Sequence, residues 1–326
     1  MRTPAIDLRW ERWERSDGDF NDLAWLDGPL EAPLVVLFHG LEGSARSHYA
    51  VSLMQALRAR GWRGVVAHFR GCSGTPNRLP RAYHAGDSAE IAALLAHLRP
   101  QAGAAPLYAV GVSLGGNALL KWLGEYGDRA QSYVARAAAV SAPVDLPAAG
   151  RALDRGLNRL YAWHFLKSLK AKMRQKRAAH PAHLGHLDLS GIWSLRAFDD
   201  RVTAPLHGFR DVDDYWTRSA SKPYLRHIAV PTLIVHARND PFMPSAAMAG
   251  PDEVSPAVTL DYPATGGHAG FPCGPFPGRL DWLPQRLLAY FEQTAGLSRN
   301  TPGRPKCLVP AGPSGLNIGC ADVSLH

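Results

Sequence analysis

Continuous apolar runs that alternate with helical patterns constrain the fold of this chain more than any other feature. An unbroken apolar run of this kind is typical of a strand that is buried on both faces. Between the runs, apolar residues recur at helical spacing. Strands that alternate with helices predict an α/β protein with a mostly parallel central sheet flanked by helices. The runs occupy residues 34–38, 65–69, 107–110, 137–140 and 232–235, and the helical patterns occupy 49–57 and 91–98.

The alternation is different at the two ends and in one long insertion. Two alternating runs on either side of Asp17-Gly18 predict an N-terminal β-hairpin. About 85 residues separate Asp145 from the strand that begins at Thr232. We interpret residues 146–228 as a helical cap over one end of the sheet, with a helical stretch from Leu153 to Tyr161. The predicted organisation is one domain over 1–297, followed by a Pro- and Gly-rich tail over 298–326 that we expect to be disordered.

The segment Gly111-Val112-Ser113-Leu114-Gly115 matches the G-x-S-x-G pattern of a nucleophilic serine. A chain with 31 glycines can contain this pattern by chance. Here, however, an apolar strand precedes it and a helix-forming run from Asn117 follows it, as the chemistry requires. A sharp strand-to-helix turn exposes the serine Oγ at the carboxyl end of the sheet. We therefore predict that Ser113 is a nucleophile.

A serine nucleophile needs a base, and His268 is the best candidate after Ser113 in the chain. Glycines flank it on both sides, which suits a loop that carries an imidazole to the edge of the sheet. His236 lies in a strand run, where a packed core histidine is the expected role. Three cap histidines have a spacing that could suggest a metal site, but we expect them to be solvated or to cap helices. These are His180, His183 and His186.

Asp240 is the predicted acid, because it follows a strand at the carboxyl edge, where such sheets place functional groups. Its expected role is to hold the tautomer of His268 and to stabilise the imidazolium. Asp261 lies inside a strand. The other acids in the cap are expected to be at the surface or at helix caps. They are Asp199, Asp200, Asp211, Asp213 and Asp214.

Two backbone N–H groups are predicted to bind the oxyanion of a tetrahedral intermediate. One is that of Leu114, directly after the nucleophile, and the other is that of Leu41, in the loop after an earlier strand. His39 is expected to shape this loop, and Glu42 to cap a backbone group or the next helix. The segment 70–74 contains Ser73 and Cys72 but has no helix directly after it, so it predicts only a turn.

Composition limits the remaining possibilities. The net charge is +8, and the run 167–177 contributes six of these charges and the tail from Arg299 two. A basic balance is compatible with nucleic acid, anionic membranes or acidic substrates. No stretch is long and apolar enough to cross a membrane, and the N-terminus lacks a signal-peptide core. Four cysteines without a C-x-x-C pair predict reduced thiols, no structural zinc and a cytoplasmic setting. No cofactor is expected.

Eight short segments carry a family resemblance, namely 39–44, 68–74, 76–78, 111–117, 141–143, 198–200, 239–243 and 266–271. Taken together, they resemble the YheT-like α/β-hydrolases, a branch of serine esterases. The resemblance implies an α/β-hydrolase fold with a helical cap and a triad of Ser113, Asp240 and His268. It also implies esterase activity on short- to medium-chain acyl groups, with some eukaryotic relatives that act on lipids or transfer acyl groups to alcohols.

We therefore predict a serine esterase whose partner is a small-molecule ester. One alternative is an alcohol O-acyltransferase, which would use the same acyl-enzyme. Another is a binding module whose basic run 167–177 contacts an anionic membrane or nucleic acid, with incidental hydrolysis. Nucleic acid is not expected, and membrane contact through this run would be weak. The favoured role of the run is a cap helix with one face on the pocket and one in water.

Overall fold

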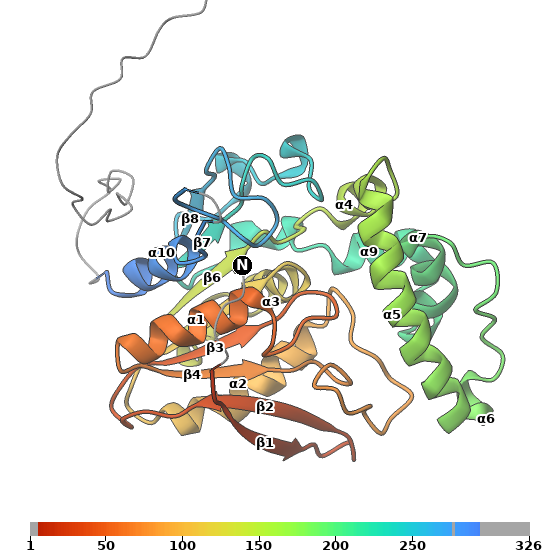
Figure 1. Ribbon diagram of the computed structural model, residues 1–326, viewed down its shortest axis with the longest axis horizontal. Helices are drawn as coiled ribbons and strands as arrows, with labels where there is room; N and C mark the ends of the chain where they lie inside the picture. The colour runs from red at the N-terminus through yellow and green to blue at the C-terminus, as the bar shows by residue number, and fades with distance from the viewer. Residues whose placement is uncertain (1–5, 276–277, 294–326) are drawn as a thin grey trace, which may run out of the picture.

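An eight-stranded sheet forms the centre of the computed structural model, which describes residues 6–275 and 278–293 (Figure 1). The strand order is β1-β2-β4-β3-β5-β6-β7-β8. The first two strands form the predicted hairpin, β2 pairs antiparallel with β4, and every later pair is parallel. The strands are β1 (Arg9–Glu14), β2 (Phe20–Leu26), β3 (Leu34–Phe38), β4 (Arg63–Ala67), β5 (Leu107–Val112), β6 (Arg136–Val140), β7 (Thr232–Val235) and β8 (Val258–Asp261).

Helices cover both faces of the sheet, as the unbroken apolar runs predict. On β3, Val36 and Phe38 face one apolar cluster with α2 and α3, while Val35 and Leu37 face a second with α1 and α10. This two-residue alternation between faces explains why all five residues of β3 are buried. The helices are α1 (His48–Ala59), α2 (Ser88–Ala102), α3 (Leu114–Tyr126) and α10 (Trp282–Phe291), with short 3₁₀ helices η1 (Gly127–Ser132), η4 (Ser245–Ala247) and η5 (Pro251–Glu253).

One predicted strand, 65–69, is displaced by two residues. The observed strand β4 ends at Ala67, and the chain leaves the sheet at His68. The imidazole of His68 accepts a hydrogen bond from the Ala45 N–H (3.0 Å) and donates one to the Asp22 carbonyl (2.9 Å). These bonds anchor the end of the strand to two neighbouring segments. The end of the strand depends on these bonds to distant segments, so it cannot be predicted from the apolar run alone.

Between β6 and β7 the chain forms a group of helices that gathers on one side of the sheet (Figure 1). They have an apolar cluster of their own, which includes Leu166, Met173 and Phe198. We call these helices the cap. They are α4 (Leu146–Leu153), α5 (Asn158–Ala179), α6 (Pro181–Leu184), α7 (Leu195–Phe198), the π-helix η2 (Asp199–Thr203), α8 (Ala204–Leu206), α9 (Val212–Ser219) and the 3₁₀ helix η3 (Lys222–His227).

The prediction of one helical stretch from Leu153 to Tyr161 is wrong. Helix α4 ends at Leu153 and α5 begins at Asn158. Gly156 between them has a φ of 52°, a left-handed conformation that interrupts a helix and that glycine adopts easily. Within the described residues, no helix has the length and hydropathy needed to span a bilayer. The predicted tail, 298–326, lies outside the described residues.

Candidate active site

Ser113 lies in the sharp turn between β5 and α3, with a φ of 52°. Its N–H is bonded to the carbonyl of Val140 on the neighbouring strand (2.8 Å). A Cβ on Gly115 would lie 2.4 Å from the Phe38 carbonyl oxygen, and one on Gly111 would lie 2.5 Å from the Gly115 carbonyl oxygen. The turn therefore has no room for a side chain at either glycine, which is the physical basis of the G-x-S-x-G pattern.

The three residues that the sequence singles out lie in one hydrogen-bonded chain. His268 Nε2 is 2.9 Å from Ser113 Oγ, and His268 Nδ1 is 2.8 Å from Asp240 Oδ2. Asp240 follows β7 and His268 follows β8, so both come from the carboxyl edge of the sheet. The Asn239 side chain holds the histidine loop by accepting the N–H groups of Gly266 and Gly267 (3.0 Å each).

His236 is a residue whose role the sequence reasoning missed. It is buried, as predicted, but its Nε2 donates to Asp240 Oδ2 at 2.8 Å. The Asp240 carboxylate also accepts the Phe242 N–H (2.8 Å). Burial raises the pKa of Asp240, but the hydrogen bonds from His236 and His268 outweigh it and lower the pKa to about 2. The available signal was a histidine at the end of a strand, four residues before the acid.

The predicted oxyanion donors, Leu41 and Leu114, belong to two segments that border the same cavity as Ser113. A Cβ on Gly40 would be 3.2 Å from Ser113 Cβ, so the Leu41 loop closely approaches the serine. The N–H groups that flank Leu41 are both occupied, Gly40 by Tyr49 Oη (3.0 Å) and Glu42 by Tyr83 Oη (2.9 Å). Among the described residues, the N–H groups of Leu41 and Leu114 have no hydrogen-bond partner. They are thus available to an oxyanion.

His39 shapes the loop, as predicted. Its Nδ1 donates to the Gly40 carbonyl (2.7 Å) and its Nε2 accepts the Phe69 N–H (3.1 Å). Both ring nitrogens are therefore engaged in a neutral imidazole. Burial, reinforced by the nearby His68, lowers the pKa of His39 to about 3. The ring consequently stays uncharged, and its bonds to the loop persist, across the neutral pH range.

Glu42 does not cap a backbone group or α1, contrary to expectation. Its carboxylate accepts hydrogen bonds from Tyr83 Oη and from Lys172 Nζ, each at 2.8 Å, and from Ser168 Oγ. The left-handed backbone at Glu42 (φ 57°) accompanies this geometry. Ser168 and Lys172 belong to α5, so one carboxylate ties the Leu41 loop to the cap. The basic run 167–177 is therefore only partly exposed to water, because Lys172 bonds to Glu42.

A cavity of about 660 Å³ lies between Ser113 and the cap. Leu41, Leu114 and His268 border it on the sheet side. Apolar side chains contributed by the cap line the opposite wall, and they include Leu146, Leu153, Phe165, Leu169, Met173 and Phe198. This volume lies within the usual range for small-molecule sites, about 300–1,000 Å³.

The two alternative nucleophiles do not join this arrangement. Ser73 lies in the predicted turn, and its Oγ donates to Asp22 Oδ2 (2.6 Å). Cys72 borders the cavity, but burial, partly offset by Lys172, raises the pKa of its thiol to about 11. A thiol that holds its proton is a poor nucleophile. The surroundings of Ser73 and Cys72 are therefore those of structural residues and not of nucleophiles.

Asp199 corrects another expectation, because it borders the cavity and is not a surface acid. Its carboxylate accepts from Trp216 Nε1 (2.9 Å) and Thr203 Oγ1 (2.8 Å). Burial raises the pKa of Asp199 to about 6. Asp211 does cap α9, by accepting the Asp214 N–H (2.8 Å). No group of three or more His, Cys, Asp or Glu side chains in the described ranges could hold a metal ion.

Comparison with known proteins gives this site its family context. The model of the α/β-hydrolase fold family matches residues 33–275. The Escherichia coli (strain K12) protein YheT, whose name marks it as a candidate esterase, is 43% identical over 283 residues, which cover 85% of this chain and 83% of YheT. Phospholipase ABHD3 of Mus musculus is 30% identical over 302 residues, which cover 89% of this chain and 72% of ABHD3.

Solved structures share the fold at low identity. The esterase Pf2001 of Pyrococcus furiosus has a TM-score of 0.58 at 14% identity, over 87% of this chain and 89% of its own. The chain thus belongs to the α/β-hydrolase family, and it is a carboxylic ester hydrolase. Within the family it is YheT-like.

Proposed function

We propose that this chain hydrolyses esters of short- to medium-chain acyl groups through an acyl-enzyme on Ser113. The observation that carries the proposal is the continuous hydrogen-bonded chain from Ser113 Oγ through His268 to Asp240. A serine hydroxyl is a weak nucleophile on its own, and a neighbouring imidazole that an acid orients is what activates it. A small-molecule ester is the substrate class that this arrangement suits.

In the proposed reaction, His268 Nε2 takes the Ser113 proton while Oγ forms a bond to the ester carbonyl carbon. The N–H groups of Leu41 and Leu114 bind the resulting oxyanion, and each such donor contributes about 3 kcal/mol of transition-state stabilisation. The intermediate then expels the alcohol, which takes the proton from His268. Water next attacks the acyl-enzyme, again with His268 as base, and releases the acid and the free serine.

The cavity supports the substrate range. The apolar side chains that the cap contributes suit an acyl chain, and about 660 Å³ is a volume for a small ester rather than for a polymer. Polar side chains also border the cavity, and among them Glu42 accepts hydrogen bonds from Lys172 and Ser168 of the cap. An acyl chain that lies along Phe165 and Leu169 would occupy the same cavity that Ser113 borders.

Turnover of p-nitrophenyl acetate, butyrate and octanoate by the wild type and by Ser113→Ala tests this proposal. We expect the variant to lose at least about 10⁴-fold in kcat. Ser73→Ala is the matched control, because it removes a hydroxyl that bonds to Asp22 and does not border the cavity. Equal rates for wild type and Ser113→Ala would refute the acyl-enzyme.

The same assay tests the alternative, acyl transfer to an alcohol. If added ethanol yields ethyl esters in place of free acid, the acyl-enzyme reacts with alcohols in preference to water. A cytoplasmic setting and the lack of a nucleic-acid partner stay predictions.

A further inference from the structure

Large apolar side chains are exposed at the start of α5, and Trp193 is exposed beside the middle of the same helix. The exposed fractions are 80% for Leu157, 68% for Leu160, 54% for Tyr161, 60% for Trp163 and 82% for Trp193. Trp193 lies beside α5, since Lys170 Nζ is 5.6 Å from its ring and donates to the neighbouring Ile192 carbonyl (3.2 Å). We call these five residues the apolar patch. Large apolar side chains exposed on one part of a folded protein mark a place of interaction.

Only two other large apolar side chains in the described residues are comparably exposed, Trp10 and Leu30. Both belong to the N-terminal part of the chain, on or after the hairpin, and neither is on the cap. The exposure of the patch is therefore a local property of the cap. Leu30, at 78% exposed, also provides a matched position for experiments.

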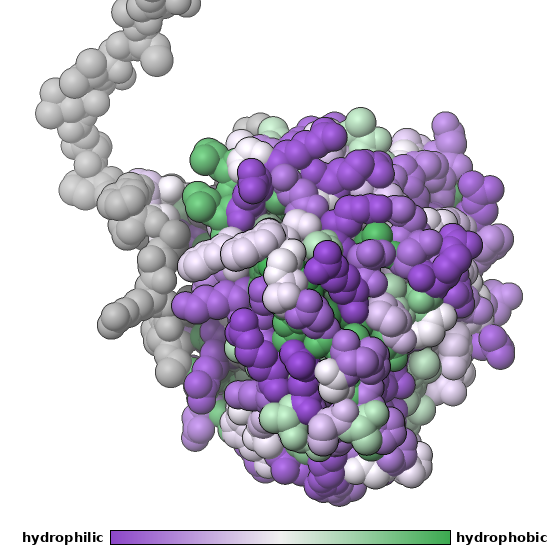
Figure 2. All heavy atoms as spheres, turned by 90° about the vertical axis from the view of Figure 1, so that its right-hand side faces the viewer, coloured by the Kyte–Doolittle hydropathy of each residue, from purple (hydrophilic) through white to green (hydrophobic). Residues whose placement is uncertain are grey.

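Positive charge surrounds the apolar patch. The chain has no acidic residue between Asp154 and Asp188. Lys167 Nζ lies 5.8 Å from the Trp163 ring, so cations border the aromatic groups directly. Two lysines of this stretch turn inward, but six cations remain, namely Arg155, Arg159, Lys167, Lys170, Arg174 and Arg177. Figure 2 looks onto the cap side, where green apolar groups lie among purple hydrophilic ones.

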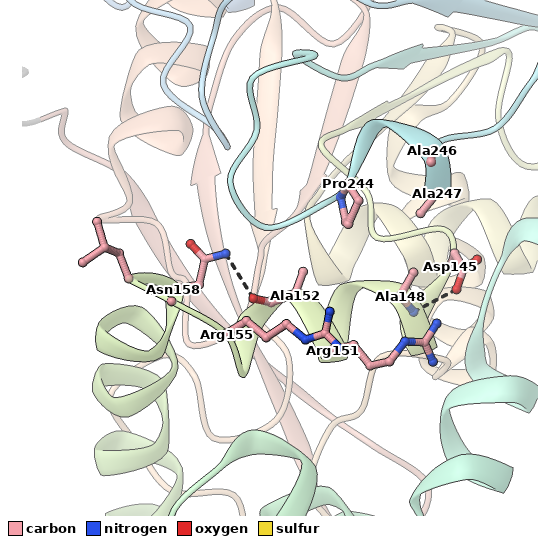
Figure 3. Close-up of a pocket in the computed structure, with 11 residues that line it drawn as sticks. Asp145, Ala148, Arg151, Ala152, Arg155, Asn158, Pro244, Ala246 and Ala247 are labelled. Atoms are coloured by element: carbon pink, nitrogen blue, oxygen red, sulfur yellow. Dashed lines mark hydrogen bonds between the residues drawn. The ribbon is translucent and has the colours of Figure 1, made fainter.

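The patch is continuous with the candidate active site. The ring of Tyr161 lies 5.0 Å from that of Phe242, which in turn lies 4.6 Å from the ring of His268. A surface groove of about 640 Å³ adjoins Leu157 between α4 and residues 244–247, and Figure 3 shows Arg151 and Arg155 along it. Aromatic contacts thus connect the exposed Tyr161 with His268 of the candidate triad.

We propose that the apolar patch and its cations dock this enzyme on the surface of an anionic phospholipid membrane. Trp and Tyr favour the membrane–water interface, exposed leucines gain by burial among acyl chains, and flanking Lys and Arg attract anionic headgroups. Docking would bring Phe242, which borders the cavity, close to a supply of apolar esters.

Two other occupants fit the patch less well. Nucleic acid offers a partner for the cations, but the aliphatic side chains of Leu157 and Leu160 would stay in water. A second copy of the chain, joined through the same patch, would bring two acid-free basic faces together, which costs electrostatic energy. A membrane satisfies the apolar and the basic groups at once.

Vesicle co-sedimentation tests the proposal. Vesicles of phosphatidylcholine alone are compared with vesicles that also contain phosphatidylglycerol, at increasing salt. We expect binding only to the anionic vesicles and a fall in binding as salt rises. Leu157→Ser and Lys167→Glu should each weaken binding by about tenfold. Leu30→Ser and Arg58→Glu, which alter exposed positions away from the cap, should bind like the wild type.

Two further measurements separate docking from catalysis. Leu157→Ser should turn over soluble p-nitrophenyl butyrate at the wild-type rate, which shows that the protein is folded. Ser113→Ala should bind vesicles like the wild type, so a failure of the proposed chemistry would leave this result unaffected. Equal vesicle binding by all variants, no binding to anionic vesicles, or displacement of the protein from them by DNA would overturn the proposal.

Discussion

The edge of the sheet and the cap each contain a shielded carboxylate, and the two have opposite pKa shifts. Burial raises the pKa of Asp240, but the imidazoles of His236 and His268 more than compensate, and the pKa is lowered to about 2. In Asp199 burial dominates, because Trp216 and Thr203 are neutral donors, and the pKa is raised to about 6. The donor set, and not burial alone, determines which acid stays charged.

This difference follows the division of the molecule. At the sheet edge, a permanent negative charge can orient His268 and stabilise its charged form. In the cap, Asp199 can keep its proton to about pH 6, because its hydrogen-bond donors, Trp216 and Thr203, carry no positive charge. The cap also exposes large apolar side chains, whereas every residue of β2, β3, β4 and β7 is buried. The sheet edge is built for fixed geometry, and the cap for contact with apolar groups.

The largest expected effect concerns Asp240. Asp240→Asn should lower kcat by about 10⁴-fold, because an amide favours the wrong tautomer of His268 and cannot stabilise its charge. Steady-state hydrolysis of p-nitrophenyl butyrate measures it. Asp213→Asn, an exposed acid of the cap that bonds to Arg196, is the control and should keep the wild-type rate. A comparable loss in both variants would show that general destabilisation, not the triad, is responsible.

Next in size is the contrast in packing. Leu119→Ala, in a fully buried position of α3, should lower the free energy of unfolding by about 2–5 kcal/mol. Leu160→Ala, in the exposed patch of the cap, should change it by less than about 0.5 kcal/mol. Denaturant titration of both variants makes the comparison. Similar losses at both positions would mean that the cap patch is covered in solution.

Asp199 predicts a pH-dependent stability. An unfolded aspartate loses its proton near pH 3.8, whereas folded Asp199 keeps it to about pH 6. The folded state binds more protons between these values, so the free energy of unfolding should fall as pH rises from about 4 to 6. Because Asp199 borders the cavity and is only partly shielded from solvent, we expect a fall of about 2 kcal/mol.

Asp199→Asn should remove this part of the pH dependence. Thermal unfolding of the wild type and the variant between pH 4 and 7 measures the difference. Asp200→Asn, at the exposed neighbouring position, is the control and should keep the wild-type slope. Parallel stability curves for wild type and Asp199→Asn would exclude the raised pKa.

The smallest effect concerns the contact between the two regions. Glu42→Gln should lower kcat by about tenfold, since it removes the charge that bonds to Lys172 and loosens the Leu41 loop. Lys172→Met should have a similar effect, and the double variant should lose little more than either single one. Strictly additive losses would show that the two residues act independently.

Much of the sheet and the site was predictable because these parts leave local patterns. Five strands are continuous apolar runs, and burial on both faces requires such runs. The turn at Ser113 needs glycine at 111 and 115, since any side chain there would collide with backbone. The order of Ser113, Asp240 and His268 then followed from the resemblance and from strand ends. The cap was less predictable, because its helices are short and Leu157 and Leu160 are exposed in spite of their hydropathy.

By itself, then, the sequence determined the mostly parallel sheet, the turn at Ser113 and the residues of the candidate triad, since each depends on neighbours along the chain. Only the tertiary structure decided that His236 shares Asp240 with His268, that Glu42 binds Lys172 and that Asp199 borders the cavity. The contact from Glu42 to Lys172 spans 130 residues of chain. Such contacts arise when separate elements pack together, and no local pattern of residue types records them.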